Sequence, residues 1–160
     1  MRDIVEASSF KDYLSSSGVH PPFTLLAPTN HAIENSRVST ARLQEIKAKK
    51  EDADVFVKRH ILPTPLCCSG VGVSSWLFTN RVKTLNENLT YKIRKDSRNR
   101  VRIGEAVVQQ CDKMASNGIV HIVDQPMVPP RPAWNVFAAP EPVTSDRRRA
   151  SDLEVLLFGL

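Results

Sequence analysis

The sequence predicts an α+β domain in which helices come first and short strands follow. Three observations support this class. Apolar residues recur at helical spacing through much of the first sixty residues, and the pattern changes to strand-like alternation from residue 81 onward. An apolar, mostly β-branched run then stands at residues 119–123, between a turn signal and several prolines. The 160 residues suit one domain with a core of its own, which we place at residues 1–130.

The helical part is predicted from apolar spacing and from capping residues. We expect an amphipathic helix at residues 3–14, a second beginning near residue 39 and a third at 52–61. Thr29 and Asn30 are good N-cap residues for a short helical turn. The third helix has one continuous apolar face, formed by Ala53, Phe56, Val57 and His60.

Strands are predicted on both sides of this helical part. Residues 23–28 form a short strand that ends at Pro28. Residues 81–111 indicate successive short antiparallel strands, with a turn at 96–99. We expect residues 112–116 to form a turn or a short helical loop into the last strand.

The last strand is predicted to be interior. Asn117 and Gly118 form a turn, because both tolerate positive φ, and Pro126 cannot take part in a strand ladder. Between them the chain is apolar on both faces apart from His121, so it needs cover on each side. We therefore expect a central strand of the fold.

Composition limits the class of protein without naming a partner. Hydrophobic residues make up 41% and charged residues 24%, a globular balance. The net charge of +5 favours anionic partners such as sulfated glycans, nucleic acid or acidic lipid. Three cysteines leave at least one thiol unpaired, and a bond from Cys67 or Cys68 to Cys111 is left open.

Residues 1–20 lack the pattern of a secretory signal, and no apolar run approaches the ~20 residues needed to span a bilayer. Either the protein is cytosolic, or the chain is a piece of a longer secreted one. Residues 131–160 indicate a proline-rich linker followed by a basic and apolar tail. The tail could be a truncated element, a docking turn or an appended remnant.

Three segments resemble the signatures of the fasciclin domain. Residues 23–32 (FTLLAPTNHA) resemble the first signature, and residues 117–124 (NGIVHIVD), followed by Val128 and Pro129, resemble the second. Residues 59–63 (RHILP) resemble the central histidine segment. The resemblance implies a β-wedge or sandwich with N-terminal and flanking helices. It also implies an extracellular adhesion or matrix module, usually repeated within a longer secreted or membrane-anchored chain.

The resemblance also implies receptor contacts, because family members have been linked to integrin binding. The candidates carried over are His60, Ile61, Leu62, Asp112 and Met114. Two positions depart from the family pattern: Arg59 stands where animal members usually have tyrosine, and Lys113 stands where some matrix members have isoleucine.

A basic cluster around the predicted turn suggests a second kind of partner. Sulfated glycosaminoglycan would be held through bidentate sulfate contacts, and the alternative is a solvated hairpin tip. Arg100 and Arg102 would share a face. The candidate glycan-binding residues are Arg94, Lys95, Arg98, Arg100 and Arg102. Separately, Asn88 begins an N-glycosylation pattern that has meaning if the chain is secreted.

Catalysis finds little support, and we predict a non-enzymatic protein with no cofactor and no metal. Nucleophile-turn, zinc-protease and phosphate-loop patterns are absent from the sequence. His60 and His121 are expected to be neutral core histidines, and a hydrolase using them with a nearby serine is the rival. Asp124 is expected to be a structural hydrogen-bond acceptor. Nucleic-acid binding lacks an evident stacking platform at 6% aromatic content.

The sequence therefore predicts an extracellular adhesion module that binds cell-surface receptors or matrix components. The alternatives are a glycosaminoglycan-binding module acting through residues 94–102 and a purely structural repeat of a longer chain. Exposed loops, rather than the buried signatures, are expected to carry specificity.

Overall fold

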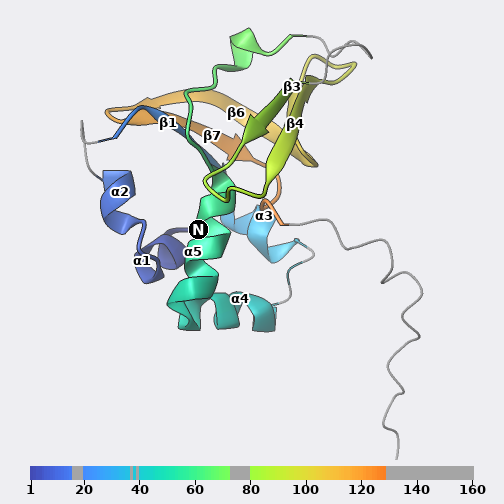
Figure 1. The fold of residues 1–160 in the computed structure, drawn as a ribbon. Coiled ribbons are helices and arrows are strands. Elements are labelled where there is room, and N and C mark those ends of the chain that lie inside the picture. Colours follow the sequence, from blue (N-terminus) through green and yellow to red (C-terminus); the bar gives the residue numbers. More distant parts are fainter. Residues whose placement is uncertain (16–19, 37, 39, 73–79, 129–160) are drawn as a thin grey trace, which may run out of the picture. The chain divides into compact units, whose positions relative to one another are not determined.

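Short helices occupy most of the first sixty residues and are interrupted by one strand (Figure 1). The computed structural model describes residues 1–128 except for 16–19, 37, 39 and 73–79, and Met1–Val128 form one compact unit. Within these residues no helix is long and apolar enough to cross a bilayer. The helices are α1 (Arg2–Ala7), α2 (Lys11–Ser15), α3 (Asn30–Glu34), α4 (Thr40–Ala48) and α5 (Lys50–His60).

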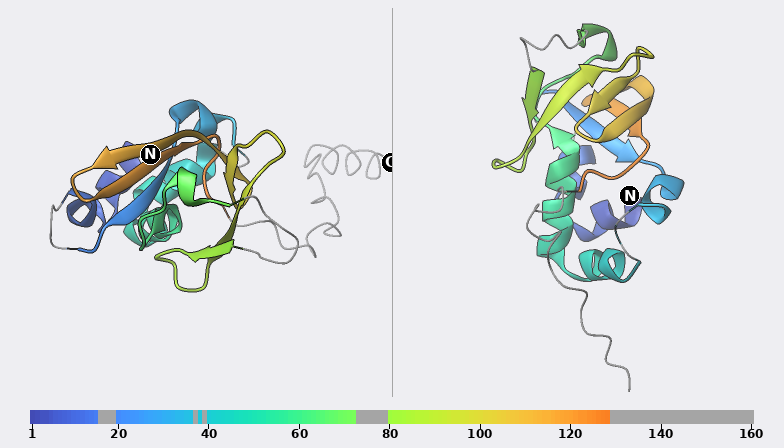
Figure 2. Two further views of the ribbon diagram at one scale, coloured as in Figure 1. Left: turned by 90° about the horizontal axis from the view of Figure 1, so that it is seen from above. Right: turned by 90° about the vertical axis from the view of Figure 1, so that its right-hand side faces the viewer.

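Seven strands form a single sheet with the order β2-β1-β7-β6-β5-β4-β3. Figure 2 gives two further views of the domain. Strand β6 is long and joins the two halves of this sheet, because its start pairs with β5 and most of the rest pairs with β7. The strands are β1 (Phe23–Pro28), β2 (Ile61–Leu62), β3 (Asn80–Lys83), β4 (Thr90–Lys95), β5 (Val101–Ile103), β6 (Ala106–Ala115) and β7 (Gly118–Val123).

The predicted interior strand is β7, which lies between β1 and β6. It runs parallel to β1 over six residue pairs, from Phe23 opposite Gly118 to Pro28 opposite Val123. Its residues are buried or half-buried along the whole strand. The sequence prediction of a covered central strand is therefore confirmed, as is the α+β wedge.

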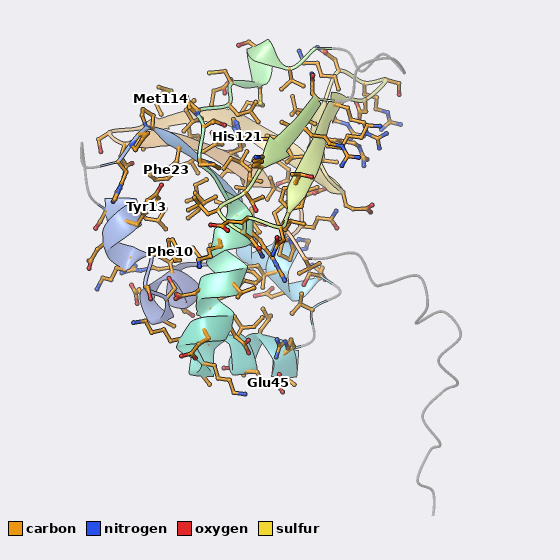
Figure 3. All side chains as sticks on the ribbon, in the orientation of Figure 1. Phe10, Tyr13, Phe23, Glu45, Met114 and His121 are labelled. Atoms are coloured by element: carbon orange, nitrogen blue, oxygen red, sulfur yellow. A yellow bond between two sulfur atoms is a disulfide. The ribbon has the colours of Figure 1, made fainter. Side chains whose placement is uncertain are left out.

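Two apolar clusters lie in the domain. One lies between the halves of the bent sheet and includes Leu26, Tyr91 and Ile103. The other lies between the sheet and the helices and includes Phe23 and Phe56. Side chains of α2 extend this second cluster, since the rings of Tyr13 and Phe23 lie 5.4 Å apart between centroids (Figure 3).

The structure corrects two helix predictions. The single helix expected at 3–14 is two helices, because the Ser8 hydroxyl donates to the Val5 carbonyl oxygen and accepts from the Phe10 N–H. The helix expected at 52–61 begins earlier, at Lys50, and Asp52 lies in its first turn. It ends at His60, and Ile61 begins strand β2.

The other local predictions have mixed outcomes. Thr29 caps α3, because its hydroxyl accepts from the Ala32 N–H at 3.0 Å. The loop expected at 112–116 is wrong, since β6 continues to Ala115. The linker and tail expected at 131–160 lie outside the described residues. The helix expected to begin near residue 39 is α4, whose described part begins at Thr40.

Gly118 is required by the close approach of β1 and β7. A Cβ atom at this position would overlap the main-chain carbonyl oxygen of Phe23, which cannot move without shifting the strand pair. We expect Gly118→Ala to lower the free energy of unfolding by roughly 2–4 kcal/mol, measured by urea denaturation. Gly72→Ala is the matched control, because no atom lies within 4 Å of a Cβ there, and equal losses in the two variants would contradict this account.

Candidate interaction surfaces

His60 ends helix α5 inside the protein, where none of its surface is exposed. The N–H of Met127 donates to Nε2 at 2.9 Å, so this nitrogen carries the lone pair and Nδ1 carries the proton. Nδ1 then donates to the Phe56 carbonyl oxygen at 2.7 Å. Burial lowers the pKa of His60 to about 4, although the Phe56 carbonyl favours the charged ring. The neutral ring thus fastens the segment after β7 to helix α5.

His121 is equally buried but has the opposite tautomer. The N–H of Asp112 donates to Nδ1 at 3.1 Å, and Nε2 donates to the Leu66 carbonyl oxygen at 2.8 Å. Both histidines are core residues with main-chain partners, as expected. The hydrolase alternative needs a histidine nitrogen that accepts a proton from a serine, whereas the ring nitrogens of both histidines are bonded to main-chain groups in this structure.

Asp112 and Cys111 lie at an irregularity in the sheet that the sequence did not indicate. The pairing of β6 with β7 jumps from Gln110 opposite Ile122 to Lys113 opposite Val120, so two residues stand against His121 alone. This β-bulge places Asp112 at a positive φ of 55°. The Asp112 N–H is left out of the strand ladder by the bulge and donates to the His121 ring instead, as described above.

The bulge is also tied to the loop after β2. The Asp112 carboxylate accepts from the Cys68 N–H at 3.0 Å, and Cys68 is disulfide-bonded to Cys111. The sequence left this pairing open, and the structure leaves Cys67 as an exposed free thiol. Closing a loop of this length stabilises a fold by about 4 kcal/mol in the chain-entropy account. The end of β6 is thus firmly held.

The same residues form a grouping with metal-ligand chemistry that sequence spacing did not reveal. Ligand atoms of Cys68, Asp112 and His121 lie within 4.8 Å of one another. Each is already engaged: the sulfur in the disulfide, the carboxylate with the Cys68 N–H, and both ring nitrogens with main-chain groups. A metal ion would have to displace these bonds. We therefore interpret the grouping as a structural contact that ties the bulge to the loop after β2.

The five receptor candidates do not share one surface. Met114, labelled in Figure 3, lies near the end of β6 and is 77% exposed. Asp112 is half-buried. His60, Ile61 and Leu62 have no exposed surface and lie in the core. Whether any of the five contacts a receptor stays a prediction. The structure shows that the last three offer no side-chain surface to a partner in this conformation.

The basic turn is organised by one acidic residue. Asp96 accepts from the main-chain N–H groups of Arg98 and Arg100, and its carboxylate pairs with the Arg100 guanidinium at 2.8 Å. These hydrogen bonds, the main-chain bond from Arg100 first, lower the pKa of Asp96 to about 2. Arg102 reaches the same carboxylate oxygen at 3.7 Å, so Arg100 and Arg102 share a face, as the alternation predicts.

The remaining candidates lie at the surface as well. Arg94 stands directly opposite Arg102, and Lys95 stands opposite Val101. Asn88 is exposed in the turn between β3 and β4. Asn88 also borders a shallow open hollow that includes Val55 and Lys58 of α5. Asp124 accepts from the Val107 N–H at 2.7 Å, which is the structural role expected for it.

These features define a helix-covered β-wedge domain whose signature segments are the buried strands β1 and β7. The family model described as "Fasciclin domain" matches residues 1–129. The chain therefore belongs to the fasciclin domain family, which is known from adhesion proteins.

Several proteins resemble the chain over most of its length. Protein sll1483 of Synechocystis is 31% identical over 79% of this chain, and human periostin is 31% identical over 81%. Transforming growth factor-beta-induced protein ig-h3 of Oryctolagus cuniculus is 29% identical over 81%. The chain spans 64% of the Synechocystis protein but 16% of periostin and 17% of ig-h3.

A solved structure supports the same fold. It is the FAS1 domain pair of the insect cell adhesion molecule fasciclin I, which matches with a TM-score of 0.55. The match covers 79% of this chain and 44% of that chain at 23% identity. At this identity the likeness establishes the fold alone.

His60 makes the stability of the domain depend on pH. Its folded pKa of about 4 lies below the unfolded value of 6.5, so the contribution is complete above pH 6.5 and is lost as pH falls toward 4. We expect roughly 2 kcal/mol of unfolding free energy to be lost between pH 7 and 5, measured by urea denaturation. His60→Gln removes the titrating ring, and an unchanged pH slope in that variant would contradict the assignment.

Proposed function

We propose that this domain is a non-catalytic extracellular adhesion module that binds cell-surface receptors or matrix components. The observation that carries the proposal is the exposed end of β6, where a large apolar side chain stands on a rigid support. Met114 is 77% exposed, and the described residues include just one other large hydrophobic side chain classed as exposed, Val55 at 40%. Methionine is among the residues enriched in protein–protein interfaces, so an exposed methionine that its surroundings hold in place is suited to partner contact.

The support of this surface favours binding without prior reorganisation. The bulge, the Cys68–Cys111 disulfide and the bond from Asp112 to His121 all lie within a few residues of Met114. A surface that is already fixed loses little conformational entropy when a partner binds. Asp112 would then contribute a carboxylate that its bond to the Cys68 N–H holds in one position.

The buried receptor candidates take an indirect part in this proposal. His60 fastens the segment at Met127, and Ile61 and Leu62 pair with β1 as strand β2. All three would act by holding the fold. Met114 and Asp112 would make the contact, with integrin-type receptors among the partners to test.

The proposed setting is a longer secreted chain in which this domain occupies residues 1–130, followed by a linker at 131–160. Relatives that are several times longer than this chain support the idea of repeated domains. One of them is named for induction by transforming growth factor-beta, and fasciclin I is named a cell adhesion molecule. A purely structural repeat is the alternative that the adhesion assay below distinguishes.

Cell adhesion to the immobilised 160-residue chain tests the receptor proposal. We expect Met114→Glu to reduce adhesion at least about fivefold, because a charge replaces the apolar contact. Val55→Glu is the matched control, since it makes the same kind of change at the other exposed hydrophobic residue. Adhesion of the unaltered chain no better than an unrelated protein would leave the structural-repeat alternative.

Glycosylation of Asn88 would support the extracellular setting. Asn88-Leu89-Thr90 is the single acceptor pattern in the sequence, and its exposed turn gives a glycosyltransferase access. When the chain is expressed through a secretory pathway, we expect one glycan that peptide-N-glycosidase removes and that Asn88→Gln lacks. Mass spectrometry reads both results, and an unmodified secreted chain would count against this part of the proposal.

A further inference from the structure

The outer face of strands β3, β4 and β5 carries a continuous row of cationic side chains. Arg81 stands directly opposite Lys92, and Arg94 stands directly opposite Arg102. Residues that are paired across strands, and alternate residues along a strand, lie on the same face of a sheet. We call the set the cationic face: Arg81, Lys83, Lys92, Arg94 and Arg102.

The inner face of the same strands belongs to the core. The alternate residues, such as Tyr91 and Ile93 of β4, are buried in the cluster between the halves of the sheet. The inner face is therefore used mainly for packing. The cationic face owes its position to this arrangement, because β4 cannot turn Lys92 and Arg94 inward without exposing its apolar side.

The charges on the cationic face are poorly compensated. Like charges directly opposite each other destabilise a sheet, and this face has two such pairs. Among the described residues, no acid forms an ion pair with Arg81, Lys83, Lys92 or Arg94, and Arg102 lies 3.7 Å from Asp96. In Figure 3, nitrogen atoms gather beside β3 and β4. A fold that accepts this repulsion is suited to an anionic ligand that removes it.

Charge counting locates the chain's positive excess in the same segment. Residues 80–103 contain eight Lys and Arg and two acids, Glu87 and Asp96, whereas the whole chain has a net charge of +5. Asp96 is taken up by the turn, where it neutralises Arg100. The turn is thus partly neutralised, and apart from Arg98 the segment's cations without a recorded ion pair lie on the strands.

We propose that the cationic face binds a sulfated polysaccharide whose chain crosses the three strands. Neighbouring strands lie ~4.8 Å apart and alternate residues along a strand ~6.7 Å apart, so long Lys and Arg side chains can reach sulfates at several points of a linear chain. Arginine can hold each sulfate through two hydrogen bonds. This inference rests on the proposed extracellular function. It places a glycan contact on the sheet, whereas the sequence pattern suggested one at the turn within residues 94–102.

Two other polyanions fit the face less well. Single-stranded nucleic acid is bound on aromatic stacking surfaces, but Tyr91, the aromatic residue of β4, faces the core and is 8% exposed. Membrane-surface binding uses apolar side chains that insert beside the cations, and the described residues of this face offer none. Within the described part of the chain this face offers charge without stacking or insertion groups, which favours a sulfated glycan.

Heparin binding by the full 160-residue chain tests the proposal. We expect binding at about 0.15 M salt, with a Kd that rises steeply with salt concentration. The variant Arg81→Glu/Lys92→Glu/Arg94→Glu should weaken binding at least about tenfold and make the salt dependence shallower, because several ionic contacts are lost. Circular dichroism and the melting temperature check that the variant is folded.

A matched control separates position from net charge. Lys11→Glu/Lys49→Glu/Lys50→Glu makes the same change in charge at exposed lysines on or beside the helices, and we expect less than about a threefold effect. An equal loss in both variants would overturn the proposal, since net charge alone would then explain binding. Failure of the unaltered chain to bind heparin at about 0.15 M salt would overturn it as well.

Two further arms identify the place and the ligand class. A loss with Arg98→Glu/Arg100→Glu that exceeds the loss with the face variant would return the contact to the turn and overturn the sheet assignment. Tighter binding to DNA or to phosphatidylserine vesicles than to heparin would overturn the choice of ligand. Adhesion assays on cells stripped of glycosaminoglycans distinguish this inference from the receptor proposal. If the chain does not bind heparin but still supports adhesion of these cells, the glycan inference is wrong and the receptor proposal stands.

Discussion

Strand β1 lies parallel to β7 over six residue pairs and joins two segments from opposite ends of the described chain. The two faces of β1 pack in different apolar clusters. Phe23 and Leu25 pack toward the helices, while Leu26 packs between the halves of the sheet. A parallel pair of this kind must be covered on both faces. The helices and the bent outer half of the sheet supply that cover, so the rest of the fold is arranged around these two strands.

The buried polar groups next to this strand pair are satisfied mainly by main-chain partners. Thr24 donates to the Thr64 carbonyl oxygen and accepts from the Leu66 N–H, each at 2.8 Å, while His121 receives the extra N–H of the bulge. His60 does the same for Met127. An unpaired buried polar group costs about 1–3 kcal/mol, so these contacts fix the loops against the sheet. These polar groups of the signature segments thus hold the fold together, and the proposed partner contacts lie elsewhere, at the surface.

Sequence reasoning found the parts of this structure that depend on local pattern. It placed β1 and β7, the turn at 96–99 and the core histidines, because apolar runs, turn residues and prolines mark them directly. It missed the division of the first helix, since the Ser8 side chain competes locally with the helix. It missed the bulge at Asp112, because that feature depends on His121 and Cys68, which are distant in sequence. It also offered Ile61 and Leu62 as contacts, although β-pairing with β1 buries them.

The cationic face shows the same division between pattern and pairing. Alternation in β4 could have placed Lys92 beside Arg94, but only the strand register sets Arg81 opposite Lys92. The sequence indicated the turn as a basic cluster because its charged residues are adjacent in sequence. The sheet brings together charged residues that are distant in sequence. Strand β6 joins both proposed surfaces, since it pairs with β5 at its start and carries Met114 near its end.

The order of strands leaves β2 and β3 as the outermost members of the sheet. Strand β2 has two residues and is followed by Pro63, so it offers few free main-chain groups for pairing with a second molecule. Strand β3 is longer, and Arg81 and Lys83 stand on it. Such cations discourage a second molecule from adding its own strand there. Replacing these basic residues by neutral apolar residues would therefore favour edge-to-edge aggregation through β3.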